Sequence, residues 1–133
     1  TKKFYILRTS WLYGQGGYVD AMLTFSNFRK EISVVNDQVG SPTRCDDVSK
    51  KIVEIIKENK PYGIYHVSNS GSASWADFTK KIFELKKRNV EVLAIDKSDF
   101  PRPAKRPKYC VLDNNEKMPD WENSLKEYLS SKK

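Results

Sequence analysis

The sequence predicts an α/β fold, in which the strands of a parallel or mixed sheet alternate with flanking helices. Short apolar runs, typical of strands buried in a sheet, occur near the start of the chain and near its middle. Between these runs, apolar residues recur at the spacing of one helix face. Such alternation of strands and helices indicates a layered α/β architecture.

Four segments are expected to form strands: 4–7, 33–35, 64–67 and 90–95. The first is apolar throughout and predicts a strand buried on both faces, the type found inside parallel sheets. Four short strands make only a narrow sheet. We therefore expect the chain to hold part of a larger sheet, in which the first strand has neighbours on both sides.

Two helices are expected before residue 60. The first covers about 19–28, where apolar residues follow the helical period. The second is expected to turn four apolar residues inward: Val48, Ile52, Ile55 and Ile56. Thr43 or Asp46 is expected to cap it, because their side-chain oxygens can accept hydrogen bonds from free amides at a helix start.

Two more helices are expected in the second half of the chain. Ser74-Trp75-Ala76-Asp77 forms a capping box, which predicts a helix start. The helix behind it is expected to bury Phe78, Ile82 and Leu85. The last helix is expected to bury four residues: Trp121, Leu125, Tyr128 and Leu129.

Composition sets limits on the class of protein. The 133 residues carry 24 Lys and Arg against 17 Asp and Glu, a net charge of +7, which favours anionic partners. No apolar run approaches the length of a membrane span, and no signal peptide is expected. Two separated cysteines and one histidine favour neither a disulfide framework nor a metal site. We expect a cytoplasmic protein, and a start at Thr1 suggests that an upstream segment was removed.

A glycine-rich turn, Gly14-x-Gly16-Gly17, lies between the first strand and the first helix. Glycines in this place can let backbone N–H groups approach a phosphate. However, Val19 stands where a dinucleotide fingerprint needs its third glycine, and no Lys-Ser or Lys-Thr follows as in a P-loop. An ordinary tight turn is therefore favoured.

Polar groups follow the first two expected strands. Arg8-Thr9-Ser10-Trp11 stands at the carboxyl end of the first strand, where ligands of open parallel sheets bind. Trp11 could cover a sugar ring or pack in the core, and position alone does not decide between these roles. Asp37 and Gln38 lie in the polar loop 36–43, which either binds a ligand or satisfies its own turn; the turn is favoured.

A basic, proline-stiffened loop covers residues 97–108. An arginine held there, such as Arg106, could bind a diphosphate through two parallel hydrogen bonds. A solvated basic surface is the alternative, and it is favoured for a charge cluster of this kind. His66 has no nucleophile nearby in the sequence, so a structural histidine is favoured over a catalytic one. The residues thus supply binding groups but no evident catalyst.

Five segments, in this order and at this spacing, resemble the C-terminal half of dTDP-4-dehydrorhamnose reductases, which belong to the extended short-chain dehydrogenase/reductase superfamily. They are Arg8-Thr9-Ser10-Trp11-Leu12-Tyr13-Gly14, Val34-Val35-Asn36-Asp37-Gln38-Val39-Gly40-Ser41-Pro42-Thr43, Gly63-Ile64-Tyr65-His66-Val67-Ser68-Asn69, Ser74-Trp75-x-x-Phe78 and Ala104-x-Arg106-Pro107-x-x-x-x-Leu112-Asp113. The resemblance runs from about residue 6 to residue 129. It implies a partial Rossmann-like sheet with a substrate-binding lobe, and it makes residues 1–133 a C-terminal portion without the cofactor-binding domain.

The resemblance also implies an activity. Enzymes of this family move hydride from NADPH, or NADH in some members, to the C4 ketone of dTDP-4-dehydro-L-rhamnose, giving dTDP-L-rhamnose. It implies that Thr9 and Ser10 lie beside the nicotinamide, that Trp11 lines the sugar pocket, and that Asp37, Gln38 and Arg106 help to hold the nucleotide diphosphate.

We expect the chain to contain no Tyr-x-x-x-Lys, the family's catalytic pair, and therefore to be inactive alone. The alternative is a non-catalytic regulatory or binding subunit of the same fold. A second copy of the chain is a further possible partner, in a homodimer, because the unpaired edge of an incomplete sheet promotes association. Nucleic acid is not expected as a partner, since most aromatic residues fall on predicted core faces, and no membrane partner is expected.

Overall fold

The computed structural model describes residues 2–96, 98, 103–104 and 106–132. Its strands are β1 (Tyr5–Arg8), β2 (Leu12–Tyr13), β3 (Glu31–Val35), β4 (Val39–Gly40), β5 (Thr43–Arg44), β6 (Gly63–His66), β7 (Ala73–Ser74) and β8 (Glu91–Ile95). Its helices are α1 (Tyr18–Phe25), α2 (Cys45–Lys57), α3 (Trp75–Leu85) and α4 (Trp121–Ser130). Strands and helices alternate through most of the chain, so the predicted α/β class is confirmed.

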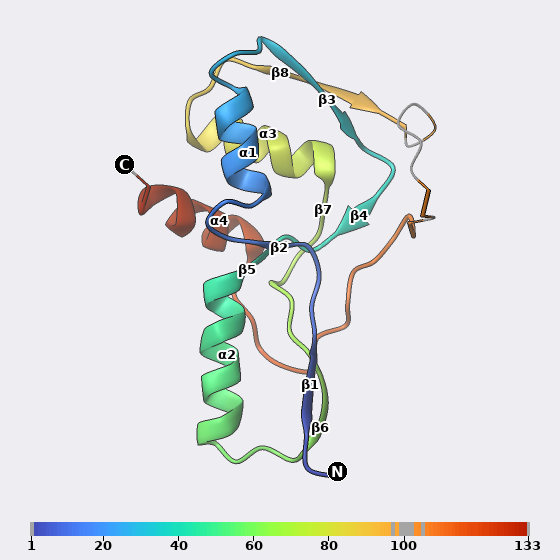
Figure 1. The fold of residues 1–133 in the computed structure, drawn as a ribbon, viewed down its shortest axis with the longest axis vertical. Helices are drawn as coiled ribbons and strands as arrows, with labels where there is room; N and C mark the ends of the chain where they lie inside the picture. The colour runs from blue at the N-terminus through green and yellow to red at the C-terminus, as the bar shows by residue number, and fades with distance from the viewer. Residues whose placement is uncertain (1, 97, 99–102, 105, 133) are drawn as a thin grey trace.

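The strands form two-stranded pieces. β1 pairs with β6, β2 with β5 and β3 with β8, all in parallel, whereas β4 and β7 are antiparallel. The β1–β6 pair lies alongside α2 at one end of the molecule, and the β3–β8 pair lies with α1 and α3 at the other (Figure 1). We call these the β1–β6 end and the β3–β8 end. The expectation of one narrow sheet is wrong for the described residues, because the short strands between the two ends separate their pairs.

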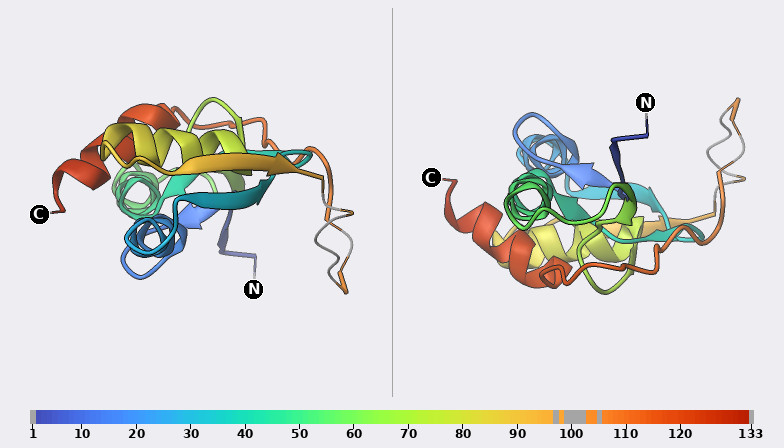
Figure 2. Two further views of the ribbon diagram at one scale, coloured as in Figure 1. Left: turned by 90° about the horizontal axis from the view of Figure 1, so that it is seen from above. Right: turned by 90° about the horizontal axis from the view of Figure 1, so that it is seen from below.

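The larger hydrophobic core belongs to the β3–β8 end, where α1, α3 and α4 pack together. Its fully or almost fully buried residues include Tyr13, Val19, Phe78, Ile82 and Leu125. In both views of Figure 2, α4 lies on one side and the arrowheads of β3 and β8 point to the other. The carboxyl ends of these two strands therefore lie on the side away from α4.

Local sequence signals explain how two of these elements begin. The Ser74 hydroxyl accepts a hydrogen bond from the Asp77 N–H at 3.0 Å, which confirms the capping box in front of α3. Before α1, the Gly17 N–H donates to the Gly14 carbonyl at 3.0 Å, and Gly16 has a φ of 73°. An ordinary tight turn was the favoured interpretation of this glycine run, and the structure confirms it, with Gly16 in the left-handed region that glycine adopts readily.

Helix α2 buries a different face from the one predicted. Ile55 is buried, but Ile52 and Ile56 are exposed, the latter by 57%. The buried residues are Asp47, Lys51 and Ile55, which follow one another at four-residue spacing. Neither predicted cap is confirmed: Arg44 precedes the helix, and the Thr43 hydroxyl instead donates to the Ser41 carbonyl at 2.9 Å.

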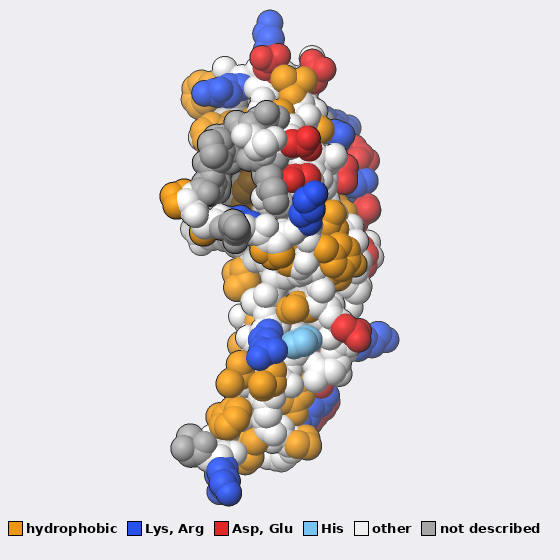
Figure 3. Space-filling model, turned by 90° about the vertical axis from the view of Figure 1, so that its right-hand side faces the viewer, with side chains coloured by type: hydrophobic (Ala, Val, Ile, Leu, Met, Phe, Trp, Pro, Cys, Tyr) orange, Lys and Arg blue, Asp and Glu red, His pale blue; other side chains and the backbone are white. Residues whose placement is uncertain are grey.

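Strand β1 is only half buried, contrary to the prediction of burial on both faces. Its residues alternate between half-buried and exposed, and Ile6 is 47% exposed. Its partner across the pair, Ile64 of β6, is 46% exposed. Apolar side chains gather over the lower half of the face shown in Figure 3, where β1 and β6 lie. An alternating pattern arises because only one face of this pair packs on the rest of the chain.

Helix α1 ends earlier than predicted, at Phe25. Phe25 is 43% exposed and Phe28 is 83% exposed, so neither contributes to the core as the helical spacing suggested. The Arg29 N–H still donates to the Phe25 carbonyl at 3.0 Å, which closes a last turn before β3 begins. The chain has to leave the helix here because β3 runs alongside β8 from Glu31 onward.

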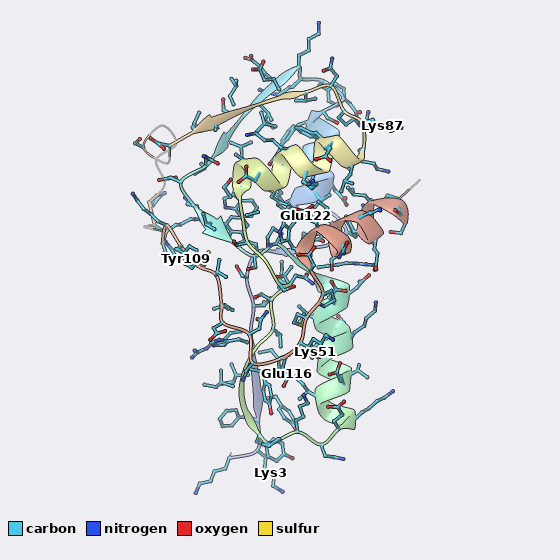
Figure 4. The ribbon with its side chains drawn as sticks, turned by 180° about the vertical axis from the view of Figure 1, so that it is seen from behind. Lys3, Lys51, Lys87, Tyr109, Glu116 and Glu122 are labelled. Atoms are coloured by element: carbon cyan, nitrogen blue, oxygen red, sulfur yellow. The ribbon has the colours of Figure 1, made fainter. Side chains whose placement is uncertain are left out.

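A buried polar network joins the two ends of the molecule. The Ser124 hydroxyl of α4 donates to the Asp47 carboxylate of α2 at 2.5 Å, and the Asn69 amide donates to the same oxygen at 2.9 Å. Further along α2, the Lys51 ammonium lies 3.9 Å from the Glu116 carboxylate, and Figure 4 shows these two side chains together. Buried charges need such partners, so this network fixes α2 against the segment before α4.

No helix among the described residues is long and apolar enough to cross a membrane. The same residues hold no group of three or more His, Cys, Asp or Glu side chains arranged so that it could hold a metal ion. His66 lies at the end of β6, half-buried, with its Nδ1 3.0 Å from the Asp113 carbonyl. Its backbone N–H also donates to the Asn115 side chain at 2.7 Å. These bonds agree with the structural role that the sequence favoured.

Candidate ligand cleft

A cleft of about 430 Å³ opens between the β3–β8 pair and the helices α1 and α3. Its floor is apolar and includes Met22, Val34 and Ile95. The polar groups of Gln38 and Arg106 lie at the same cleft. An apolar hollow with a few polar groups is the usual form of a small-molecule site.

Two aromatic side chains from different helices line the cleft. Tyr18 is the first residue of α1 and Trp75 the first of α3, and their ring centroids lie 4.6 Å apart. The Tyr18 hydroxyl lies 2.6 Å from the Thr79 hydroxyl, which holds the tyrosine ring in place. Burial raises the pKa of Tyr18, and the hydrogen bond with Thr79 opposes that rise only in part. Tyr18 is therefore a neutral aromatic surface near physiological pH.

Trp11 is held against this aromatic pair by stacking. Its ring centroid lies 3.8 Å from that of Trp75, and the two planes are only 12° apart. The Trp11 backbone has a φ of 41°, in the left-handed region that bulky residues rarely adopt. Such a conformation costs about 1–3 kcal/mol and persists where the surroundings determine it. Trp11 itself is not among the residues that line the cleft, and it contacts the cleft wall by stacking on Trp75.

Thr9 and Ser10 lie at the carboxyl end of β1. Ser10 is buried, and its hydroxyl accepts a hydrogen bond from the Ser41 N–H at 3.4 Å. The buried Thr9 hydroxyl has no hydrogen-bond partner among the described residues. Neither residue lines the cleft, but the chain runs directly from them into Trp11.

The polar loop after β3 contributes to the cleft in part. Gln38 lines it, whereas Asp37 is half-buried beside Gln38 and is not a lining residue. Asn36 has a structural role, because its side-chain oxygen accepts a hydrogen bond from the Ser74 hydroxyl at 2.7 Å. This bond ties the loop to the start of α3.

Arg106 reaches the cleft because the following segment runs beside β4. The Val39 N–H donates to the Lys108 carbonyl at 2.8 Å, and the Cys110 N–H donates to the Val39 carbonyl at 2.9 Å. Figure 4 shows Tyr109 at this position, next to β4. Of the other cations in the predicted basic loop, Lys97, Arg102 and Lys105 lie outside the described residues.

The structure thus brings together three of the six predicted site residues. Gln38 and Arg106 line one cleft, and Trp11 stacks on a wall of it. Thr9, Ser10 and Asp37 lie on adjoining segments. Sequence reasoning missed Tyr18 and Trp75 as cleft residues. Trp75 was interpreted only as part of the capping box. The signal that could have identified it is an aromatic residue in the first turn of a helix that faces the end of a sheet.

The expectation that the chain contains no Tyr-x-x-x-Lys is wrong as a statement about the sequence, since Tyr128 and Lys132 have this spacing. The structure places both against α1. The Tyr128 hydroxyl donates to the Asp20 carboxylate at 3.0 Å, and the Lys132 ammonium pairs with the same oxygen at 2.5 Å. Neither residue lines the cleft. We interpret this pair as a structural tie between α4 and α1.

Comparisons with known proteins identify the family. The family described as RmlD substrate binding domain matches residues 1–133. The chain is 36% identical to the spore coat polysaccharide biosynthesis protein SpsK of Bacillus subtilis strain 168, over 99% of this chain and 49% of that protein. It is also 36% identical to a dTDP-4-dehydrorhamnose reductase of Sinorhizobium fredii, over 91% of this chain and 47% of that protein.

Solved structures agree with these relatives. A dTDP-4-dehydrorhamnose reductase of Clostridium acetobutylicum matches with a TM-score of 0.90 and 41% identity, over 95% of this chain and 48% of that one. The Bacillus anthracis enzyme in complex with NADP also matches with a TM-score of 0.90, at 42% identity, over 98% of this chain and 49% of that one. The predicted resemblance and the extended short-chain dehydrogenase/reductase fold are confirmed. The chain spans about half the length of the curated relatives that it matches, and it belongs to the RmlD substrate-binding domain family.

Proposed function

We propose that this chain is the substrate-binding portion of a dTDP-4-dehydrorhamnose reductase. The whole enzyme would reduce the C4 ketone of dTDP-4-dehydro-L-rhamnose with NADPH and release dTDP-L-rhamnose. The observation that carries the proposal is the cleft at the β3–β8 end, because it joins a guanidinium, an amide and two aromatic rings over an apolar floor.

Each part of the cleft suits one part of a nucleotide sugar. The Arg106 guanidinium is exposed at the cleft and can form two parallel hydrogen bonds with a diphosphate. The Gln38 side chain offers both a donor and an acceptor to hydroxyl or carbonyl groups. The rings of Tyr18 and Trp75 offer flat apolar surfaces.

The cofactor would touch this chain at the carboxyl end of β1. There the buried Thr9 hydroxyl has no partner among the described residues, which fits a polar group such as a carboxamide beside it. Ser10 would help to position the same group, while its hydroxyl keeps the bond to Ser41. When bound, NADPH supplies the hydride for the reaction. Most of its binding site would lie outside residues 1–133.

The chain alone is expected to bind the nucleotide sugar but not to reduce it. Reduction of the ketone needs a proton donor at the carbonyl oxygen. The one Tyr-x-x-x-Lys spacing in the sequence is tied to Asp20, away from the cleft. Turnover of dTDP-4-dehydro-L-rhamnose by residues 1–133 with NADPH, above the rate without protein, would contradict this part of the proposal.

Titration calorimetry with dTDP and with dTDP-L-rhamnose tests the binding role. Arg106→Ala is expected to weaken both ligands by roughly 10- to 100-fold, because hydrogen bonds to a charged group contribute about 1.5–3 kcal/mol. Lys50→Ala is the matched control, since it removes one exposed cation from α2 and leaves the cleft unchanged. Equal losses in the two variants would show that only net charge matters and would remove the support for a cleft at Arg106.

A further inference from the structure

We propose that Trp75 contacts the nucleotide base of the bound ligand, and that Trp11 and Gly40 position its ring for this contact. The inference rests on the proposed function and goes beyond it, because it assigns the base to one side chain. A flat base is the part of a nucleotide sugar that stacks best on an indole. With the diphosphate at Arg106, the apolar part of the cleft between Trp75 and Val34 is left for the base.

The Trp75 ring is fixed on one side by the ring of Trp11, at 3.8 Å between centroids and 12° between planes. Tyr18 packs on Trp75 at a tilt, with the ring centroids 4.6 Å apart. A ring held by two others loses little freedom when a ligand contacts the part of it that lines the cleft, so more of the contact energy appears as affinity. The stacked pair therefore makes Trp75 a preorganised surface.

Gly40 allows the Trp11 ring to take this position. A Cβ atom built on Gly40 would lie 2.4 Å from Cε2 of Trp11 and 2.7 Å from its Nε1. Contacts this short force a shift, and Gly40 itself is fixed because β4 pairs with β7 at Gly40 and Ala73. The indole would have to move. Gly40 is thus required for the stack by close approach, since only a residue without a side chain fits under the ring.

The Trp11 backbone has little room to follow such a shift. Its carbonyl accepts a hydrogen bond from the Thr43 N–H at 3.1 Å, and its φ is already 41°. Thr43 is fully buried and bonded to Asn69 and Ser41. A side chain at position 40 would therefore displace the ring rather than the backbone, and it would remove the support of Trp75.

The first test is spectroscopic and needs no ligand. Two stacked indoles give an exciton couplet in far-ultraviolet circular dichroism, and the chain has three tryptophans. Gly40→Ala, Trp11→Phe and Trp75→Phe are each expected to abolish the couplet while the helical signal stays. Trp121→Phe is expected to keep the couplet, and Gly14→Ala is the matched glycine control, since its new Cβ meets only the Cys45 side chain, at 3.3 Å or more. A couplet that survives in Gly40→Ala would overturn the positioning role.

The second test separates the base from the diphosphate by calorimetric titration with dTDP and with inorganic pyrophosphate. Trp75→Ala is expected to weaken dTDP by roughly tenfold or more, the usual size of a lost base–aromatic stack, and to leave pyrophosphate unchanged. Gly40→Ala is expected to do the same to a smaller extent. Arg106→Ala is expected to weaken both ligands.

The outcomes distinguish this inference from the proposed function. Equal dTDP affinity in the wild type and in Trp75→Ala overturns the base contact and leaves the nucleotide-sugar cleft in place. A parallel loss of dTDP and pyrophosphate in Trp75→Ala also overturns it, because the substitution would then act through the diphosphate end. Absence of dTDP binding in the wild type overturns both proposals.

Discussion

The two ends of the molecule contain the same kinds of element but bury them to different extents. At the β3–β8 end, three helices enclose a continuous core that includes Phe78 and Ile82. At the β1–β6 end, one helix covers one face of a strand pair, and its small core contains Ile55 and Val67. The residues of the candidate ligand cleft gather at the enclosed end. A rigid, well-packed scaffold can hold such groups at fixed distances, whereas a half-covered one cannot.

The β1–β6 end exposes five large apolar residues, three on or beside the strand pair and two on α2: Phe4, Ile6, Ile64, Ile52 and Ile56. Among the described residues, β1 pairs with β6 on one side only. Open strand edges and apolar patches of this kind promote association with other protein surfaces. We therefore expect the β1–β6 end to depend on further protein for its full burial, and the β3–β8 end to be complete in this chain.

The largest difference between the two ends is expected for loss of a core side chain. Phe78 is 0% exposed and contacts Tyr13, Tyr18 and Trp121 through ring pairs. Phe78→Ala is expected to lower the free energy of unfolding by about 3–5 kcal/mol, because it removes buried area and leaves a cavity. Urea denaturation followed by circular dichroism measures this. A loss below 1 kcal/mol would mean that the β3–β8 end is not the stable part of the fold.

A smaller effect is expected at the tie between α4 and α1, and it depends on pH. Burial alone would raise the pKa of Asp20, but hydrogen bonds from Lys132, Gly16 and Tyr128 lower it below its usual value. The ionised form is therefore favoured in the folded state. Its stabilising contribution is present above the unfolded pKa of about 4 and is lost as the pH falls through the lower folded pKa.

Asp20→Asn is accordingly expected to lower the Tm by a few degrees near pH 7, and by less at pH values below the folded pKa of Asp20. Thermal unfolding at a series of pH values measures the difference. Asp113→Asn is the control, because it removes one exposed carboxylate outside this tie. Identical pH profiles for the wild type and Asp20→Asn would exclude a stabilising role for the tie.

The smallest change in stability is expected at the exposed face of the β1–β6 end. Ile6→Ser is expected to change the free energy of unfolding by less than about 0.5 kcal/mol, as for other exposed positions. The same substitution is expected to reduce self-association, measured by analytical ultracentrifugation over a range of concentrations. A large loss of stability together with unchanged association would show that Ile6 is part of an enclosed core and would remove the contrast between the two ends.

The contrast also explains what the sequence could predict. Ser74 and Asp77 predicted the start of α3 because a capping box acts within one turn and needs no tertiary information. Phe78, Ile82, Leu125 and Leu129 were predicted to be buried because helical spacing identifies a face that packs against something in the same chain. These signals are local. At the β3–β8 end they were correct for α3 and α4, whereas the spacing after α1 was misleading, because Phe25 and Phe28 are exposed.

The same signals were wrong at the β1–β6 end. Ile52 and Ile56 of α2 follow the helical period, yet they are exposed. Asp47 and Lys51 are buried instead, and they form hydrogen bonds with Ser124 and Glu54 respectively. Periodicity shows which apolar residues share one face of a helix. It does not show whether the protein surface that covers this face is part of the same chain. Within the candidate site, Trp75 was missed because its role comes from contacts with Trp11 and Tyr18, which are distant in sequence.

The Asp47, Asn69 and Ser124 network has a consequence for how this chain loses its structure. These three groups come from α2, the segment after β6 and α4, and their bonds are 2.5–3.1 Å long. If one of these segments opens, a buried charge or amide loses its hydrogen-bond partner. Local opening of one segment is therefore unfavourable, and the three segments are expected to unfold together. Hydrogen exchange of the amides around Asn69 should therefore follow global melting, even though the neighbouring helix surface is open to solvent.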